Sequence, residues 1–137
     1  MRVATWITLQ NEKVVILPAK GNYLAVERNF LLSCLRSMIS QIYVDDAYYL
    51  DANADVAEAV RQGVLKTAKD HYVSFGFLEN RLPYSITVEE DWYLEQYRDV
   101  REAVETGVFA TAQDHFNAVG FKEGRHPFPA FVLKTVG

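Results

Sequence analysis

Apolar and polar residues alternate near the start of the chain and then recur in steps of three and four. Side chains at residues 3–9 alternate between two faces, and a β-branched run at residues 14–17 ends at Pro18. This pattern predicts a β-hairpin. From Leu24 to Ile42 the apolar positions follow three- and four-residue steps, which predicts one long amphipathic helix.

The stretch from residue 49 to 83 returns from residue 93 to 127 at a constant offset of 44 residues and without a gap. The matching positions include Tyr49-Leu50 with Tyr93-Leu94, Asp55-Val56 with Asp99-Val100, Gly63 with Gly107, Thr67 with Thr111, His71 with His115, and Arg81 with Arg125. Matches this dense at one offset indicate two copies of one supersecondary unit.

Each copy contains start and stop signals for three short helices. Acidic residues precede the first helix, and a glycine, Gly63 or Gly107, ends the second. The third helix begins at a capping box at Thr67 or Thr111. We expect it to end at the equivalent glycines of the two copies, Gly76 and Gly120. An extended Glu-x-Arg-x-Pro tail follows.

The predicted fold is therefore mainly α, with two tandem three-helix repeats of 44 residues preceded by a β-hairpin and one long amphipathic helix. We divide the chain into residues 1–43, a first copy at residues 44–86 and a second copy at residues 87–130.

Composition narrows the function classes. The chain has 137 residues, half of them apolar or aromatic, so a core can form without disulfides. The lone cysteine, Cys34, is interpreted as an inert core thiol.

No secretory signal is recognisable, so the cytoplasm is the expected location. No apolar run approaches the ~20 residues that span a bilayer, which excludes membrane insertion.

Charge argues against a nucleic-acid partner. The net charge is -4 and no basic stripe is present. A helix-turn-helix alternative would place Asp70-His71 or Asp114-His115 in the recognition helix, where basic residues are needed.

No catalytic, cofactor-binding or metal-binding constellation is recognisable, so we expect that the protein is not an enzyme. His71 and His115 could bind a metal or move protons, but neither has a second ligand three or four residues away. We favour a structural role in which each imidazole bonds a loop carbonyl. Asp70 and Asp114 are explained by the capping boxes.

The repeated Glu-Arg pairs lie outside the predicted helices. Arg81 and Arg125 could lock the tails by bonding several carbonyls, or could bind a ligand, and we favour the first. Aromatic side chains could stack on sugars, but core packing is favoured for them too. The candidate ligand or partner surface comprises Trp92, Tyr93, His71, His115, Glu79, Arg81, Glu123 and Arg125.

The pattern Tyr-Leu, Asp-Val, Ala-Val, Gly, Thr-Ala, His-Tyr or His-Phe, Gly, Glu-x-Arg-x-Pro resembles a short tandem repeat found beside the catalytic domains of bacterial glycosyltransferases and other cell-surface polysaccharide proteins. The resemblance covers residues 44–128 and carries no catalytic domain with it. It implies a non-catalytic interaction or scaffold module that binds a protein in bacterial polysaccharide or envelope biology. The alternative is a small carbohydrate-binding module.

Residues 1–43 are expected to form a homodimer contact. Two repeats are fewer than the three that such stacks usually need, and a hairpin has open edges. A second chain would supply the missing cap.

Overall fold

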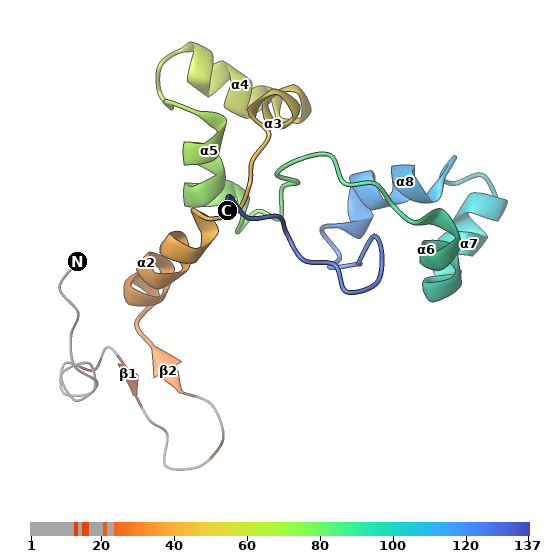
Figure 1. Ribbon diagram of the computed structural model, residues 1–137, viewed down its shortest axis with the longest axis horizontal. Helices are drawn as coiled ribbons and strands as arrows, with labels where there is room; N and C mark the ends of the chain where they lie inside the picture. Colours follow the sequence, from red (N-terminus) through yellow and green to blue (C-terminus); the bar gives the residue numbers. More distant parts are fainter. Residues whose placement is uncertain (1–12, 14, 17–20, 22–23) are drawn as a thin grey trace. The chain divides into compact units, whose positions relative to one another are not determined.

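The computed structural model describes residues 13, 15–16, 21 and 24–137, and they are mainly helical, which confirms the predicted class (Figure 1). The chain divides into two compact units, Met1–Ser40 and Gln41–Gly137. Both sequence copies lie in the second unit. In the described part of the chain, no helix is long and apolar enough to cross a membrane.

The first unit contains a short strand pair and a helix. Strand β1 (Val15–Ile16) pairs with the antiparallel strand β2 (Ala25–Val26), and α2 covers Arg28–Ile39. The predicted hairpin falls largely on residues 1–12, 14 and 17–18, which lie outside the described residues. The predicted helix start at Leu24 is wrong, because β2 takes up the next two residues and the Glu27 carboxylate then caps α2.

Helix α2 buries little of its apolar stripe. Ile39 is buried, whereas Leu31, Cys34 and Met38 are exposed. The interpretation of Cys34 as a core thiol is therefore wrong: no described residue covers that side of the helix. The helix also ends before the predicted limit, since Ile42 already belongs to an extended segment.

The second unit contains one set of elements twice. The first set is α3 (Asp46–Ala52), α4 (Ala54–Arg61), α5 (Ala68–His71) and η1 (Tyr72–Gly76), a π-helix that continues α5. The second set is α6 (Glu90–Gln96), α7 (Arg98–Glu105), α8 (Ala112–His115) and η2 (Phe116–Gly120), again a π-helix. Each bound in the second set is the first bound plus 44.

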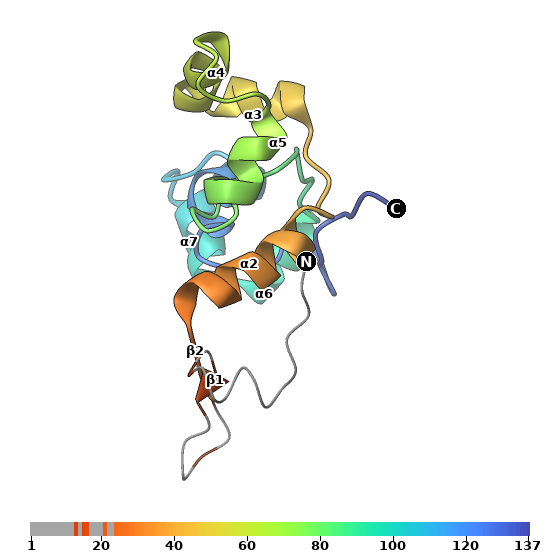
Figure 2. The ribbon, with the colours of Figure 1, turned by 90° about the vertical axis from the view of Figure 1, so that its left-hand side faces the viewer.

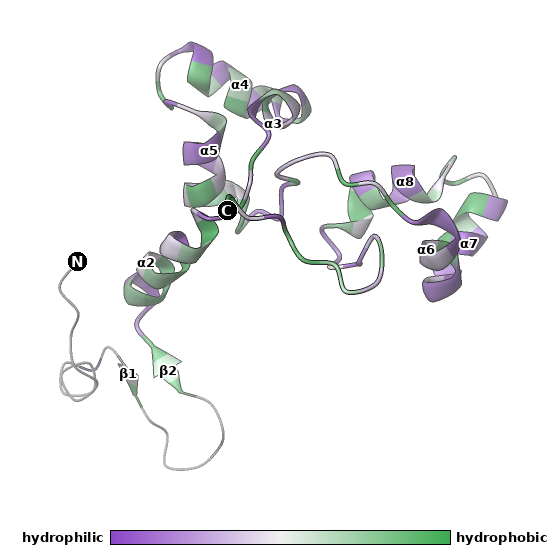
Figure 3. Cartoon of the chain, in the orientation of Figure 1, coloured by the Kyte–Doolittle hydropathy of each residue, from purple (hydrophilic) through white to green (hydrophobic). Residues whose placement is uncertain are grey.

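Side-chain caps explain where these helices begin and end. The Asp45 carboxylate accepts a hydrogen bond from the Tyr48 N–H at 3.0 Å at the start of α3. The Thr67 hydroxyl accepts from the Asp70 N–H at 3.1 Å and donates to the Asp70 carboxylate at 2.9 Å. Gly63, with φ +73°, ends α4 as predicted. Figure 3 shows α4 and α5 with alternating green and purple bands, as expected for helices with one apolar face.

The third helix of each copy ends at the predicted glycine, Gly76 or Gly120, but without the left-handed glycine cap that was expected. Neither Gly76 nor Gly120 has a positive φ, and each is the last residue of a π-helix. A β-carbon at Gly76 would overlap the Tyr49 hydroxyl, so close approach requires the glycine. The left-handed position lies four residues later, at Asn80 (φ 53°) and Gly124 (φ 74°).

Each copy has its own small core. Helices α3, α4 and α5 contact one another in a group that both views show (Figures 1 and 2), around the buried residues Tyr49, Val56 and Tyr72. The second copy packs Tyr93, Val100, Ala112 and Phe116 together with Tyr84, Ile86 and Val88 from the segment before it.

A segment near the end of the chain pairs with the start of this unit. Ile42 forms an antiparallel bridge with Thr135, the Tyr43 N–H donates to the Lys134 carbonyl at 2.7 Å, and the Val136 N–H donates to the Gln41 carbonyl at 2.6 Å. The bridge joins parts of the second unit that are far apart in sequence.

Candidate functional site

A buried tyrosine-histidine pair occupies the centre of each copy. Tyr49 Oη lies 3.0 Å from His71 Nδ1, and Tyr93 Oη lies 3.0 Å from His115 Nδ1. The two histidines were expected to bond loop carbonyls, and that expectation is wrong. The tyrosine comes from the first helix of the copy and the histidine from the first turn of the third, so the hydrogen bond ties these two helices together.

Burial keeps both members of each pair neutral near pH 7. Desolvation, and then the Arg81 charge, lowers the pKa of His71, and burial raises the pKa of Tyr49 to about 12. In the second copy, desolvation and then the Arg125 charge lower the pKa of His115, and burial raises the pKa of Tyr93. A neutral phenol hydrogen-bonded to a neutral imidazole inside a core stabilises the fold but has no access to a substrate.

This burial removes three residues from the candidate surface. Tyr93 is 0% exposed, and His71 and His115 are 8% and 5% exposed. They cannot form a ligand or partner surface, because the helices of their own copy cover them. Trp92 is partly exposed.

An arginine-carboxylate cluster holds the tail of each copy. The Arg81 guanidinium donates to both oxygens of Asp55 at 2.8 Å and to Glu79 at 2.6 Å. Arg125 donates to Asp99 at 2.8 and 2.5 Å and to Glu123 at 2.7 Å. The partners are carboxylates rather than the carbonyls that the sequence suggested, because the start of the second helix places an aspartate beside the tail.

The charges in these clusters are mutually satisfied. Hydrogen bonding to Arg81 lowers the pKa of Asp55 to about 2, and hydrogen bonding to Arg125 lowers that of Asp99 to about 2. The arginine side chains are 22% and 20% exposed, whereas both aspartates are 63% exposed. Each guanidinium is therefore committed to a bidentate ion pair.

The two copies differ in what lies next to the arginine. Arg81 also donates to the Asn53 side-chain oxygen at 2.9 Å. In the second copy the equivalent position holds Tyr97, and Arg125 lies over its ring, 4.9 Å from the centroid. The Tyr97 hydroxyl accepts from the His126 N–H at 2.9 Å.

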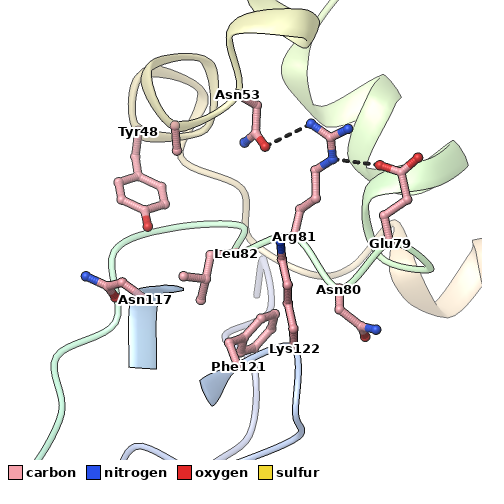
Figure 4. A pocket seen from close by; sticks show the side chains of 10 residues that line it. Tyr48, Asn53, Glu79, Asn80, Arg81, Leu82, Asn117, Phe121 and Lys122 are labelled. Carbon is pink, nitrogen blue, oxygen red and sulfur yellow. Dashed lines mark hydrogen bonds and ion pairs between the residues drawn. The ribbon is translucent and has the colours of Figure 1, made fainter. Parts of the chain in front are cut away.

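A cavity of about 440 Å³ lies where the two copies meet, and we call it the inter-copy pocket. Its lining comes from α3 and the tail of the first copy and from the π-helix and following turn of the second: Tyr48, Ala52, Asn53, Glu79, Asn80, Arg81, Leu82, Asn117, Phe121 and Lys122. Figure 4 shows Leu82 beside Phe121, with Tyr48 and Asn117 on one side and Asn80 on the other.

Several polar groups in this pocket are not used by the fold. Among the described residues, the Lys122 ammonium and the Asn80 side chain have no hydrogen bond or ion pair. The Asn117 oxygen accepts from Gln113 at 3.0 Å, which leaves its NH₂ group for a ligand. Burial raises the pKa of the Tyr48 phenol, which therefore remains a hydrogen-bond donor. The pocket therefore presents hydrogen-bond donors and acceptors beside the apolar side chains of Leu82 and Phe121.

The sequence analysis placed two residues that line the pocket, Glu79 and Arg81, on its candidate surface, and it counted Tyr48 among the aromatic side chains that could stack on sugars but favoured core packing for them. Asn80, Asn117 and Lys122 carry no helix or motif signal. One signal was present: at the turn after the third helix the copies differ, with Leu78 in the first and Lys122 in the second. A position that differs between otherwise matching copies is a reason to look for a local role.

No cluster of three or more histidine, cysteine, aspartate or glutamate side chains that could hold a metal ion occurs among the residues that the structure describes. Comparison with family models, with curated proteins and with solved structures gave no match to this chain.

Proposed function

We propose that the chain is a non-catalytic interaction module that binds a protein partner at the inter-copy pocket. The observation that carries the proposal is the pocket itself, which both copies build and which presents polar groups that the fold does not use. The groups suited to chemistry are instead engaged inside each copy, as the Tyr49-His71 pair illustrates. In this proposal the copies act as two tandem three-helix repeats that together create a recognition surface.

The resemblance of the sequence supports a setting in bacterial polysaccharide or envelope biology, with the module itself in the cytoplasm. Self-association through residues 1–43 remains part of the proposal. Exposed Leu31 and Met38 on α2 support it, because apolar side chains on one helix face favour burial against a partner.

Photo-cross-linking in bacterial cells tests the proposal. A photoreactive amino acid at Asn80 should give a discrete protein adduct that mass spectrometry identifies. Lys122→Glu should weaken adduct formation about tenfold, since it reverses the unpaired charge in the pocket. Lys66→Glu makes the same charge change at an exposed residue outside the pocket lining and should leave the adduct unchanged. Equal adduct formation in both variants would contradict binding at this pocket.

A carbohydrate ligand is the second candidate, favoured by the composition of the lining. Asparagine amides such as Asn80 and Asn117 match sugar hydroxyls, and the rings of Tyr48 and Phe121 could pack against the C–H face of a sugar. NMR titration with oligosaccharides of bacterial surface polysaccharides would test it. Saturable shifts of the asparagine side-chain amides, lost in Asn117→Ala, would replace the protein partner with a glycan.

A further inference from the structure

The inter-copy pocket shows which surface one copy presents to the next. The second copy contributes residues 117–122 and the first copy contributes its first helix and tail. We call residues 73–78 and 117–122 the heads of the two copies. We call residues 48–53 with 79–82, and the equivalent residues 92–97 with 123–126, their tail faces. Inside the chain, the head of the second copy meets the tail face of the first.

The head of the first copy is more apolar than the head of the second. Val73 stands where the second copy has Asn117, and Leu78 stands where it has Lys122. Leu78, in the turn after η1, is 53% exposed, and Val73 on η1 is partly exposed. Val73 and Leu78 thus put apolar side chains at two positions whose counterparts in the second copy, Asn117 and Lys122, line the inter-copy pocket.

The tail face of the second copy is more aromatic than that of the first. Trp92 replaces Tyr48, and Tyr97 replaces Asn53. The two rings are partly exposed and lie edge to face with their centroids 6.3 Å apart. Rigid aromatic pairs of this kind are common anchors in protein interfaces.

We propose that the tail face of the second copy in one chain docks on the head of the first copy in another chain. The contact would repeat the junction inside the chain, with Leu78 and Val73 against Trp92 and Tyr97. The difference in polarity has a physical reason. A covalent link holds the two copies of one chain together, so their junction can stay polar, whereas two separate chains must bury apolar area to offset lost translational freedom.

Such a contact joins two different surfaces, so it is heterologous. It leaves a free head at one end and a free tail face at the other, and assemblies grow stepwise or close into rings. A dimer through residues 1–43 would instead stop at two chains. The proposal is independent of what the inter-copy pocket binds.

Mixing two complementary variants tests the proposal by sedimentation velocity over a range of concentrations. Leu78→Lys installs on the first head the residue that the second head already carries. Trp92→Lys disrupts the tail face, and Trp92→Tyr installs the milder residue of the first copy in case the lysine variant does not fold. Each variant alone should associate about tenfold more weakly than the parent or worse, because burial of a large apolar side chain is lost.

An equimolar mixture of Leu78→Lys with the Trp92 variant should form a one-to-one complex that does not grow. Each chain in it still has one intact surface, and the two intact surfaces are complementary. Val64→Lys, a similar change at a 74% exposed position outside both surfaces, should associate like the parent. Every chain in the experiment also carries Met38→Lys on α2, which disrupts the self-association proposed for residues 1–43, so the remaining association reports on the head and the tail face.

Three outcomes would overturn the proposal. One is a one-chain mass for the parent up to millimolar concentration. Another is a mixture in which the two variants fail to pair although both are folded. The third is association that survives Leu78→Lys in a chain with Met38 intact and disappears when Met38→Lys is added, which would assign it to residues 1–43.

Discussion

The tyrosine-histidine pairs show how burial alone decides the chemistry of a residue. The Tyr49 phenol and the His71 imidazole are a combination that enzymes use, yet here both are neutral and enclosed. Desolvation disfavours the charged form of each side chain, so protonation of the imidazole at acid pH lowers the stability of the folded state.

This makes stability depend on pH. Because the pKa of His71 and of His115 is lowered in the folded state, the unfolded chain binds more protons below about pH 6.5. We expect the stability present at pH 7.5 to fall as the pH is lowered towards 5, measured as Tm by circular dichroism. The slope should flatten in His71→Gln/His115→Gln, even if its absolute Tm is lower. His126→Gln, at an exposed histidine, is the matched control.

Gly120 is predicted to be the least replaceable glycine of its copy. A β-carbon there would overlap the Tyr93 hydroxyl, so Gly120→Ala should cost about 1–3 kcal/mol in the free energy of unfolding measured with urea. In a Tyr93→Phe background the cost should shrink, because the overlapping oxygen is gone. An additive double variant would show that this contact is not the cause.

At the scale of elements, the arginine clusters join the tail of each copy to the start of its second helix. Arg125→Ala should lower the unfolding free energy by about 1–2 kcal/mol, and Arg125→Lys by less, since lysine keeps the charge and loses the planar fork. Urea denaturation measures both. If both variants unfold like the parent, the cluster does not hold the tail.

Acid should weaken the same connection. The pKa of Asp99 is lowered to about 2, so the contribution of the ion pair is fully present above about pH 4 and is lost as the pH falls towards 2. Asp99→Asn should reduce the acid dependence of unfolding in this window. Asp51→Asn, at an exposed carboxylate, serves as the control.

The helices could be predicted from sequence because their signals are local and occur twice. The caps at Thr67 and Thr111, and the glycine stop at Gly63, lie within a turn of what they determine. The π-helices could not be predicted, because no local sequence signal marks them; the glycine at the end of η1 approaches a tyrosine from another helix, which only the folded copy reveals.

The arginine partners were predicted as the wrong chemical group for a similar reason. Asp55 lies 26 residues before Arg81, and only folding of the copy brings them together. Likewise, the start of α2 was misplaced because Ala25 and Val26 pair with β1, which helical periodicity does not reveal.

At the scale of the whole molecule, the bridge between residues 41–43 and 134–136 connects distant parts of the second unit. Val136→Pro removes the N–H that donates to the Gln41 carbonyl and should lower the unfolding free energy by about 1 kcal/mol. Val136→Ala keeps the donor and should have a smaller effect, since the side chain is 51% exposed. Hydrogen exchange at Tyr43, which donates to Lys134, should accelerate in the proline variant. Unchanged exchange would mean that the bridge is not stabilising.

The same bridge has a consequence during synthesis on the ribosome. Residues 41–43 leave the exit tunnel about 90 residues before residues 134–136 do, which at the usual elongation rate is an interval of several seconds. The short helices of the first copy need only microseconds to form. The first copy can therefore be complete while the edge at Ile42 still lacks its partner, and on a crowded polysome that edge is open to pairing with a neighbouring nascent chain.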